Sequence, residues 1–202
     1  LLGPVSDANA KRSFNLDDFQ GSPYTNNNFQ PTRVFYKDED MGRLFYRYNA
    51  LNNEIEVKKS PQEEGIRALG RDKNIAIMVD GNPMSFKTFV DRNKNTLNGY
   101  LTLLEEGEKY DLYRRIRVKY TEGQKAANSF VKAIPARFSQ FTEYYVQEKG
   151  VNRIDEFDAK NRSLYKLVGS DKKSAIKSYI KENDLNIKDE QDLIQVFQHL
   201  NQ

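Results

Sequence analysis

Residues 74–89 contain two apolar runs separated by a short polar turn. They read Asn-Ile-Ala-Ile-Met-Val, then Asp-Gly-Asn-Pro, then Met-Ser-Phe-Lys-Thr-Phe. An Asp-Gly pair between two such runs is a strong local signal for a β-hairpin, because both residues tolerate the positive φ angles of a tight turn. This segment therefore predicts two antiparallel strands that turn at Asp80-Gly81.

Three further hairpins are predicted on either side of this one. Each consists of two segments in which apolar and polar residues alternate around turn-forming residues. The paired segments are 42–48 with 54–58, 100–104 with 110–120, and 141–147 with 151–157. Residues 121–136 show no sustained period, and we expect an extended connection that includes a turn of helix. Sequential hairpins favour an antiparallel sheet that is curled or closed like a barrel.

After residue 160 the apolar pattern changes to a helical period. Leu164, Leu167 and Val168 precede Gly169, which favours the left-handed end of a helix. Two more apolar stripes, at residues 175–180 and 193–200, follow at three- and four-residue spacing. We expect an α+β fold with a mainly antiparallel β-sheet, curled or barrel-like, and a small C-terminal bundle of two to three short helices.

These patterns divide the chain into three segments. Residues 1–30 are rich in Asn, Asp, Ser, Gly and Pro and predict an extended leader. Residues 31–160 form the antiparallel β domain, and residues 161–202 form the helical segment packed on it. Within the leader, Ala8-Asn9-Ala10 has the small-x-small form of a signal-peptidase site, which is either the remnant of a signal peptide or a chance tripeptide.

The composition excludes several kinds of site. The chain has no Cys, which rules out disulfides, thiolate nucleophiles and cysteine-bound zinc or iron–sulfur clusters. Its single His rules out polyhistidine metal sites, and no Gly-rich phosphate-binding motif occurs. The net charge of +3 is too small to attract a polyanion without a local basic patch. We expect no metal, no cofactor and no membrane-spanning segment.

No catalytic residue is predicted. The sequence contains no Gly-x-Ser-x-Gly motif that would supply a nucleophilic Ser for His199 to activate. We therefore interpret His199 as a surface histidine. The acidic clusters 105–108 and 155–158 lack the signs of burial that a general acid needs. Residues 38–40 lack the Gly and the distant Glu of a calcium loop, and Ser170 near Lys172 and Lys173 fits a helix cap with solvated lysines.

One strand segment carries a basic and aromatic face. Residues 113–120 place alternate side chains on one side, and residues 43 and 47 extend that side if their strand lies alongside. The candidate partner-binding residues are Arg43, Arg47, Tyr113, Arg115, Arg117 and Lys119. Cations interleaved with an aromatic ring suit phosphates and stacked bases. The alternative is an ordinary polar strand face that pairs with acids such as Glu54 and Glu56.

A second candidate site is a pocket inside the curled sheet. Its expected lining residues are Tyr46, Tyr48, Phe86, Phe89 and Arg114. Strand alternation points Arg114 inward, so this side chain requires an acidic or carbonyl partner, a sheet edge or a cavity. A pocket of this kind would belong to a small-ligand carrier.

Three parts of the sequence carry a resemblance to known proteins. They are residues 22–24, residues 46–49 with 54–57, and the ending from Leu164 to Asn201, in which residues 167–173 and 189–194 are the most distinctive. Together they resemble secreted or periplasmic cell-envelope proteins of Gram-negative bacteria. The resemblance implies export through a signal peptide, and it supplies no catalytic residue or substrate.

Three functions remain open at the level of sequence. The leading hypothesis is a non-enzymatic envelope protein, periplasmic or secreted, either free or associated with the outer membrane. It would bind another envelope protein or a surface polymer, or give structural support. The second hypothesis is the small-ligand carrier. The third, which the modest net charge disfavours, is binding of single-stranded nucleic acid through the basic strand face.

Overall fold

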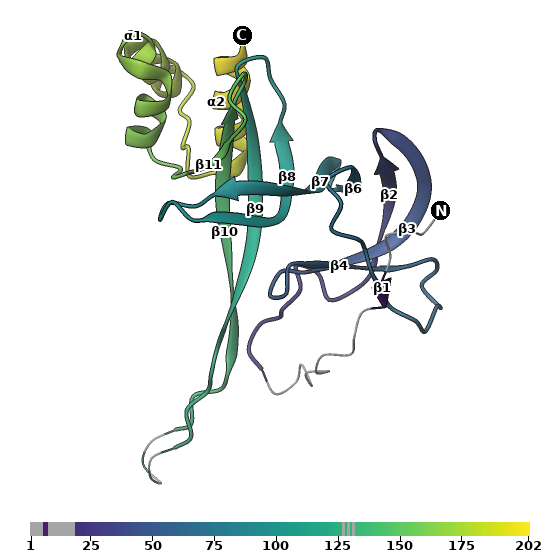
Figure 1. Cartoon of the computed structure of the whole chain (residues 1–202). Coiled ribbons are helices and arrows are strands. Elements are labelled where there is room, and N and C mark those ends of the chain that lie inside the picture. Colours follow the sequence, from purple (N-terminus) through teal and green to yellow (C-terminus); the bar gives the residue numbers. More distant parts are fainter. Residues whose placement is uncertain (1–5, 8–18, 127, 129, 131) are drawn as a thin grey trace. The chain divides into compact units, whose positions relative to one another are not determined.

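The computed structural model describes residues 6–7, 19–126, 128, 130 and 132–202, and it shows an α+β fold (Figure 1). The predicted fold class is confirmed, because a mainly antiparallel sheet with a partial ring is followed by two C-terminal helices. The proposed signal-peptide remnant at residues 8–10 lies outside the described residues.

The chain divides into two compact units. Unit 1 comprises Leu1–Phe86 with Ile116–Thr142, and unit 2 comprises Lys87–Arg115 with Glu143–Gln202. Three strands contribute residues to both units, namely β7 (Asn82–Val90), β9 (Tyr110–Thr121) and β10 (Arg137–Glu148). The units therefore divide the predicted β domain of residues 31–160, and unit 2 also contains the helical segment 161–202.

Unit 1 is built on antiparallel strands in the order β1-β5-β4-β3-β2-β6-β7. Their bounds are β1 Ser6–Asp7, β2 Gln30–Tyr36, β3 Glu39–Asn49, β4 Glu54–Lys58, β5 Arg67–Ala68 and β6 Ile75–Val79. The two hairpins predicted here are present, because β3 pairs with β4 and β6 pairs with β7. Asp80 and Gly81 have φ angles of 51° and 82°, as a tight hairpin turn requires.

Strand β2 forms a hairpin with β3 that the sequence patterns do not predict. Its turn residues Lys37 and Asp38 adopt φ angles of 48° and 67° although neither is a glycine. Position 38 is therefore part of a turn, but the usual Gly signal of such a turn is missing. The strand register also shifts between Val34 and Phe35, which interrupts the alternation of side chains.

The described end of the leader is held on unit 1 by backbone hydrogen bonds. Gln20 N–H donates to the Ala136 carbonyl at 3.0 Å, and the Pro23 carbonyl accepts from Ala50 N–H at 2.9 Å. Between them Gly21 has a φ angle of 81°, and a β-carbon at this position would lie 2.4 Å from the Phe138 carbonyl oxygen. Only glycine fits this close approach of two backbones.

Unit 2 contains a ring of strands in the order β7-β11-β10-β9-β8, closed by a further pairing of β7 with β8. Strand β8 spans Thr96–Glu105 and β11 spans Ile154–Phe157. The pairing of β7 with β11 is parallel and the others with a determined register are antiparallel. The interior of the ring is filled by the side chains of Phe89, Leu101, Tyr113, Tyr145 and Ile154.

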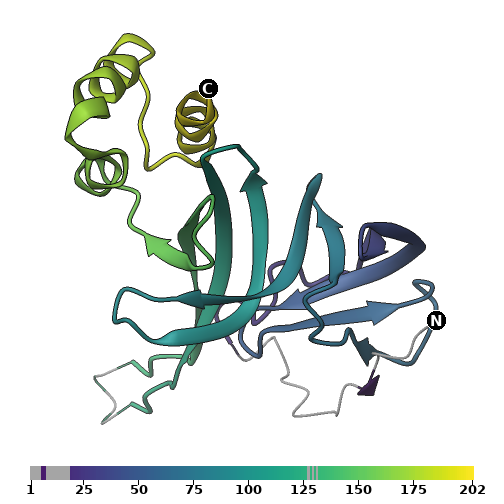
Figure 2. The ribbon, with the colours of Figure 1, turned by 45° about the horizontal axis from the view of Figure 1, so that its top comes forward.

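The helices α1 (Asn161–Glu182) and α2 (Glu190–Asn201) pack with the outer face of this ring in one hydrophobic cluster. Figure 2 shows α2 next to the end of the strands, with α1 further from them. Leu112 and Val146 of the strands pack there with Leu164, Leu193 and Phe197 of the helices. Gly169 has φ and ψ angles of 78° and 175° and divides α1 into two helical segments, in agreement with the predicted two to three helices. The Asp189 side chain caps α2 by accepting from Gln191 N–H and Asp192 N–H.

Candidate partner-binding surface

The predicted basic strand face does not form one continuous surface within either unit. Arg43, Arg47, Arg117 and Lys119 belong to unit 1, and Tyr113 and Arg115 belong to unit 2. The six residues also differ in what they contact.

Tyr113 is buried rather than displayed. Only 5% of its surface is exposed, and its ring packs inside the strand ring of unit 2. Burial, followed by the neighbouring Asp111 carboxylate, raises the pKa of Tyr113 above its ordinary value. The expectation that Tyr113 lies on a solvated face is wrong, because closure of the ring and docking of the helices cover both faces of β9 at residues 112–113.

Arg115 is engaged in an ion pair within unit 2. Its guanidinium lies 3.1 Å from a Glu143 carboxylate oxygen and 5.0 Å from the centroid of the Phe89 ring. Both partners of the ion pair are largely buried, and the same carboxylate accepts a hydrogen bond from the Tyr145 hydroxyl. These contacts fit the alternative interpretation, a polar strand face that is satisfied by acids of the same chain.

Arg47 is the centre of a cation–π and ion-pair cluster in unit 1. Its guanidinium stacks on Tyr24 at 3.8 Å and on Phe29 at 4.7 Å, and its Nη2 atom lies 2.6 Å from Glu56. The Tyr24 hydroxyl also donates to Glu56, and burial together with this carboxylate raises the pKa of Tyr24. Arg47 therefore fastens the segment before β2 to the β3–β4 hairpin.

The remaining basic residues of unit 1 are more open to solvent. Arg43 is exposed and lies opposite Arg33 in the register of β3 with β2. Arg117 lies over the Phe141 ring at 5.0 Å, and Lys119 is exposed two residues further along β9. Of the predicted partner-binding residues, Arg43 and Lys119 are exposed, and Arg117 is half-buried.

The residues predicted to line a pocket do not come together in one unit. Tyr46, Tyr48 and Phe86 belong to unit 1, and Phe89 and Arg114 belong to unit 2. Phe89 fills the strand ring, whereas Arg114 is the next residue after ring-filling Tyr113 and contacts α2 on the outer face. The prediction of one pocket lined by all five residues therefore finds no counterpart within either unit.

Arg114 lies on the outer face of the ring, so the predicted inward orientation is wrong. It nevertheless has the acidic partner that its partial burial requires. Its Nη1 atom donates to Glu190 at 2.6 Å, and the Tyr144 hydroxyl donates to the other oxygen of the same carboxylate at 3.2 Å. Among the described residues, Arg114 Nε is a buried nitrogen without a hydrogen-bond partner. Burial, followed by Glu190, raises the pKa of Tyr144 to about 12. This cluster fastens the start of α2 to the strands.

The other titratable groups considered in the sequence also make contacts within their own unit. Arg92 holds the Glu156 carboxylate through its backbone and guanidinium nitrogens, and His199 stacks on Tyr179 at 3.7 Å between the two helices. Within the described ranges, no three His, Asp or Glu side chains gather in a way that could hold a metal ion.

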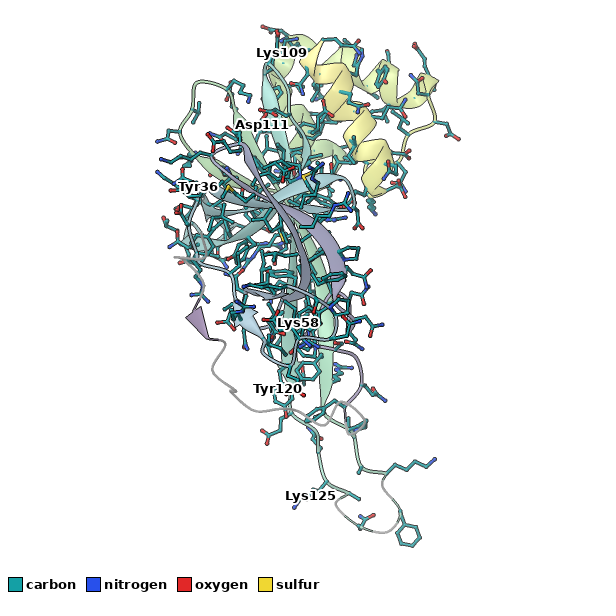
Figure 3. The ribbon with its side chains drawn as sticks, turned by 90° about the vertical axis from the view of Figure 1, so that its right-hand side faces the viewer. Tyr36, Lys58, Lys109, Asp111, Tyr120 and Lys125 are labelled. Atoms are coloured by element: carbon teal, nitrogen blue, oxygen red, sulfur yellow. The ribbon has the colours of Figure 1, made fainter. Side chains whose placement is uncertain are left out.

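A long hairpin end in unit 1 is the most exposed apolar feature of the described chain. We call the described residues between Glu122 and Ala136 the finger; they connect β9 to β10 (Figure 1). Gln124 and Ile134 exchange two backbone hydrogen bonds of 2.8 Å across it. A β-carbon on Gly123 would lie 2.6 Å from Ala136 N, so glycine allows the two strands to approach closely. Figure 3 shows Lys125 well beyond Tyr120 along this hairpin.

The end of the finger displays apolar and cationic side chains together. The exposed fraction is 95% for Phe130 and 57% for Ile134. Lys125 and Lys132 are also exposed, and we call these four residues the finger surface. The Asn128 side chain accepts a hydrogen bond of 3.0 Å from Phe130 N–H.

The charge of this region has one sign. The sequence from Gly123 to Thr142 contains no Asp or Glu, whereas it contains Lys125, Lys132 and Arg137. At the base of the finger, Tyr120 and Phe138 pack with Phe19, with ring centroids 5.4 to 6.2 Å apart. The arrangement can bind an anionic partner that also accepts an aromatic ring.

The finger was not predicted from the sequence because residues 121–136 show no sustained period. The expected turn of helix is absent from the described residues of this segment, which contain the Gln124–Ile134 bridge, a bend at Asn128 and a turn at Phe130. Two signals could have identified it, namely the long run without acids and a Phe that belongs to no amphipathic pattern.

No helix among the described residues is long and apolar enough to cross a bilayer. Comparison with known proteins adds no relatives, since no protein-family model, curated protein or solved structure matches this chain.

Proposed function

We propose that this protein is a non-enzymatic, exported component of the cell envelope that acts by binding another envelope component through the finger surface. The observation that carries the proposal is Phe130, a large apolar side chain with an exposed fraction of 95% next to exposed lysines. The other large apolar side chains that are exposed in the described chain have exposed fractions between 37% and 57%.

Covering this ring with a partner would contribute roughly 1.5 to 3 kcal/mol of binding free energy through burial of apolar surface. Phe130 also belongs to a hairpin whose strands exchange paired hydrogen bonds between Gln124 and Ile134. In contrast, Arg47, Arg114 and Arg115 already have partners within their own unit. The finger surface is thus the better candidate for contact with another molecule.

A second candidate function is the binding of single-stranded nucleic acid along the parts of β9 and β10 that belong to unit 1. The observation that favours it is the contact of Arg117 with the Phe141 ring next to exposed Lys119, a cation and aromatic pair that could stack on a base. This function predicts affinity for oligonucleotides that falls steeply with salt and is lost in the Phe141→Ala variant.

The proposal is tested by cross-linking from the finger. A photoreactive phenylalanine analogue replaces Phe130 in the tagged full-length chain, which is then irradiated in an envelope extract of the producing organism. We expect one dominant adduct, which disappears when Lys125 and Lys132 are both replaced by Gln. The control places the same analogue at Phe141, which has an exposed fraction of 42%. Equal adducts from both positions, or none from position 130, would contradict the proposal.

A further inference from the structure

We infer that the partner of the finger surface is an anionic phospholipid bilayer, with Phe130 entering the headgroup layer and Lys125 and Lys132 contacting lipid phosphates. This inference rests on the proposed function and names its partner class. It concerns peripheral docking of a hairpin end on the surface of a bilayer.

The location of the exposed apolar side chains supports a bilayer as the partner. Phe130 and Ile134 are exposed at the narrow end of a two-stranded hairpin, where the Gln124–Ile134 hydrogen bonds already satisfy the backbone before the tip. Docking of this kind reaches only the headgroup layer, where water and lipid headgroups remain available to polar backbone groups. Phe is among the apolar side chains that interfacial segments bury at that depth.

The positive charge of the finger surface also supports an anionic bilayer as the partner. The lysines flank the aromatic ring in sequence, and the absence of acids from Gly123 to Thr142 removes local repulsion from lipid phosphates. Long lysine side chains can keep the ammonium group in the headgroup layer while their methylene groups accompany the ring. Each basic residue near an anionic bilayer increases partitioning roughly fivefold.

Other partners fit the finger surface less well than a bilayer does. A stable protein interface usually involves about 20 to 30 residues on each side, whereas the finger surface presents four side chains at the end of one hairpin. Single-stranded nucleic acid requires successive rings for stacked bases, and the finger surface has one ring. A lipid bilayer requires neither a large complementary surface nor a row of rings.

The chain contains no Trp, so Phe130→Trp introduces a single fluorescent reporter at the proposed depth. We expect vesicles of phosphatidylcholine with phosphatidylglycerol to shift the emission of this full-length variant to shorter wavelength. Lipids brominated near the headgroup should quench it. Vesicles of phosphatidylcholine alone should have a much smaller effect, and added salt should reverse binding. An emission maximum that anionic vesicles leave unchanged would overturn the inference.

Sedimentation with anionic vesicles measures the contribution of each group. Two lysines at roughly fivefold each predict that Lys125→Gln with Lys132→Gln lowers the partition coefficient about 25-fold. Phe130→Ala should lower it about tenfold. The matched control is Lys172→Gln with Lys177→Gln on α1, which removes the same charge from exposed positions and should leave binding unchanged. Equal losses from control and finger variants would show general electrostatic attraction and reject docking by the finger.

The same reporter separates this inference from the proposed function. Cross-linking from position 130 to an envelope protein, combined with no response to vesicles, would reject the bilayer and retain partner binding by the finger. A response to oligonucleotides but not to vesicles would also reject the bilayer. If neither cross-linking nor vesicles produce a signal, the inference and the proposed function both fail.

Discussion

Replacing Gly107 by Ala should destabilise unit 2 although the backbone there accepts any residue. The reason is Asn201, whose side chain occupies the space: a β-carbon on Gly107 would lie 1.8 Å from Asn201 Nδ2. Asn201 Oδ1 accepts from Lys109 N–H at 3.2 Å and from Tyr110 N–H at 2.9 Å, and Nδ2 donates to the Tyr110 carbonyl at 3.0 Å. These three bonds fasten the end of α2 to the β8–β9 hairpin.

The expected magnitude follows from the number of bonds. A new methyl group at residue 107 forces the Asn201 side chain out of place and breaks all three bonds. At about 1 kcal/mol for each net hydrogen bond, Gly107→Ala should lower the free energy of unfolding by about 3 kcal/mol. Asn201→Ala removes the same bonds and should have a similar effect. The double variant should resemble either single variant, because both changes act on one interaction.

The assay is urea unfolding followed by circular dichroism for the two single variants, the double variant and two controls. Gly65 has open space around its α-carbon and Asn152 is exposed, so Gly65→Ala and Asn152→Ala should change the free energy of unfolding very little. Additive losses in the double variant would refute the reasoning, since they would mean that Gly107 and Asn201 stabilise the protein independently. A neutral Gly107→Ala variant would refute it as well.

Three further predictions concern the polar clusters of the two units. Arg47→Lys should lower the free energy of unfolding by about 1 to 2 kcal/mol, because an ammonium group cannot both stack on Tyr24 and Phe29 and hold Glu56 through two nitrogens; urea unfolding measures this loss. Arg114→Met should cost about 2 kcal/mol by leaving the Glu190 carboxylate without its cation, and Arg114→Met with Glu190→Leu should recover part of the loss in the same assay. The raised pKa of Tyr144 means that the unfolded chain ionises first as pH rises from the ordinary value of 10.0 to about 12, so stability should fall across that range. Tyr144→Phe should reduce the slope of the unfolding midpoint against pH in that range, and an unchanged slope would contradict the assignment.

The hairpins and the helical ending could be predicted from the sequence because their determinants are local. Asp80-Gly81 marks a turn by its backbone preferences alone, and Gly169 interrupts a helix for the same reason. Strand β2 was not predicted because its turn residues, Lys37 and Asp38, adopt positive φ angles although neither is a glycine. Their conformation depends on the pairing of β2 with β3 and β6, which lies outside any short window.

The site was less predictable because exposure is a property of the packed chain. Alternation along residues 113–119 implied one solvated face, yet Tyr113 is buried and Lys119 is exposed on the same strand. The difference arises because the first part of β9 lies in the closed ring beneath the helices, whereas its last part leads to the finger. Periodicity within one strand contains no information about what covers each of its faces.

The sequence alone therefore determined the cysteine-free composition, the local turns, the period of each element and the acid-free run around Phe130. Tertiary structure alone decided which aromatic rings are buried, that Arg47 and Arg114 are held by Glu56 and Glu190, and that Phe130 is left in solvent. The physical reason is that turns and periods arise from interactions between neighbouring residues. Burial and ion pairing arise from contacts between segments that only the folded chain brings together.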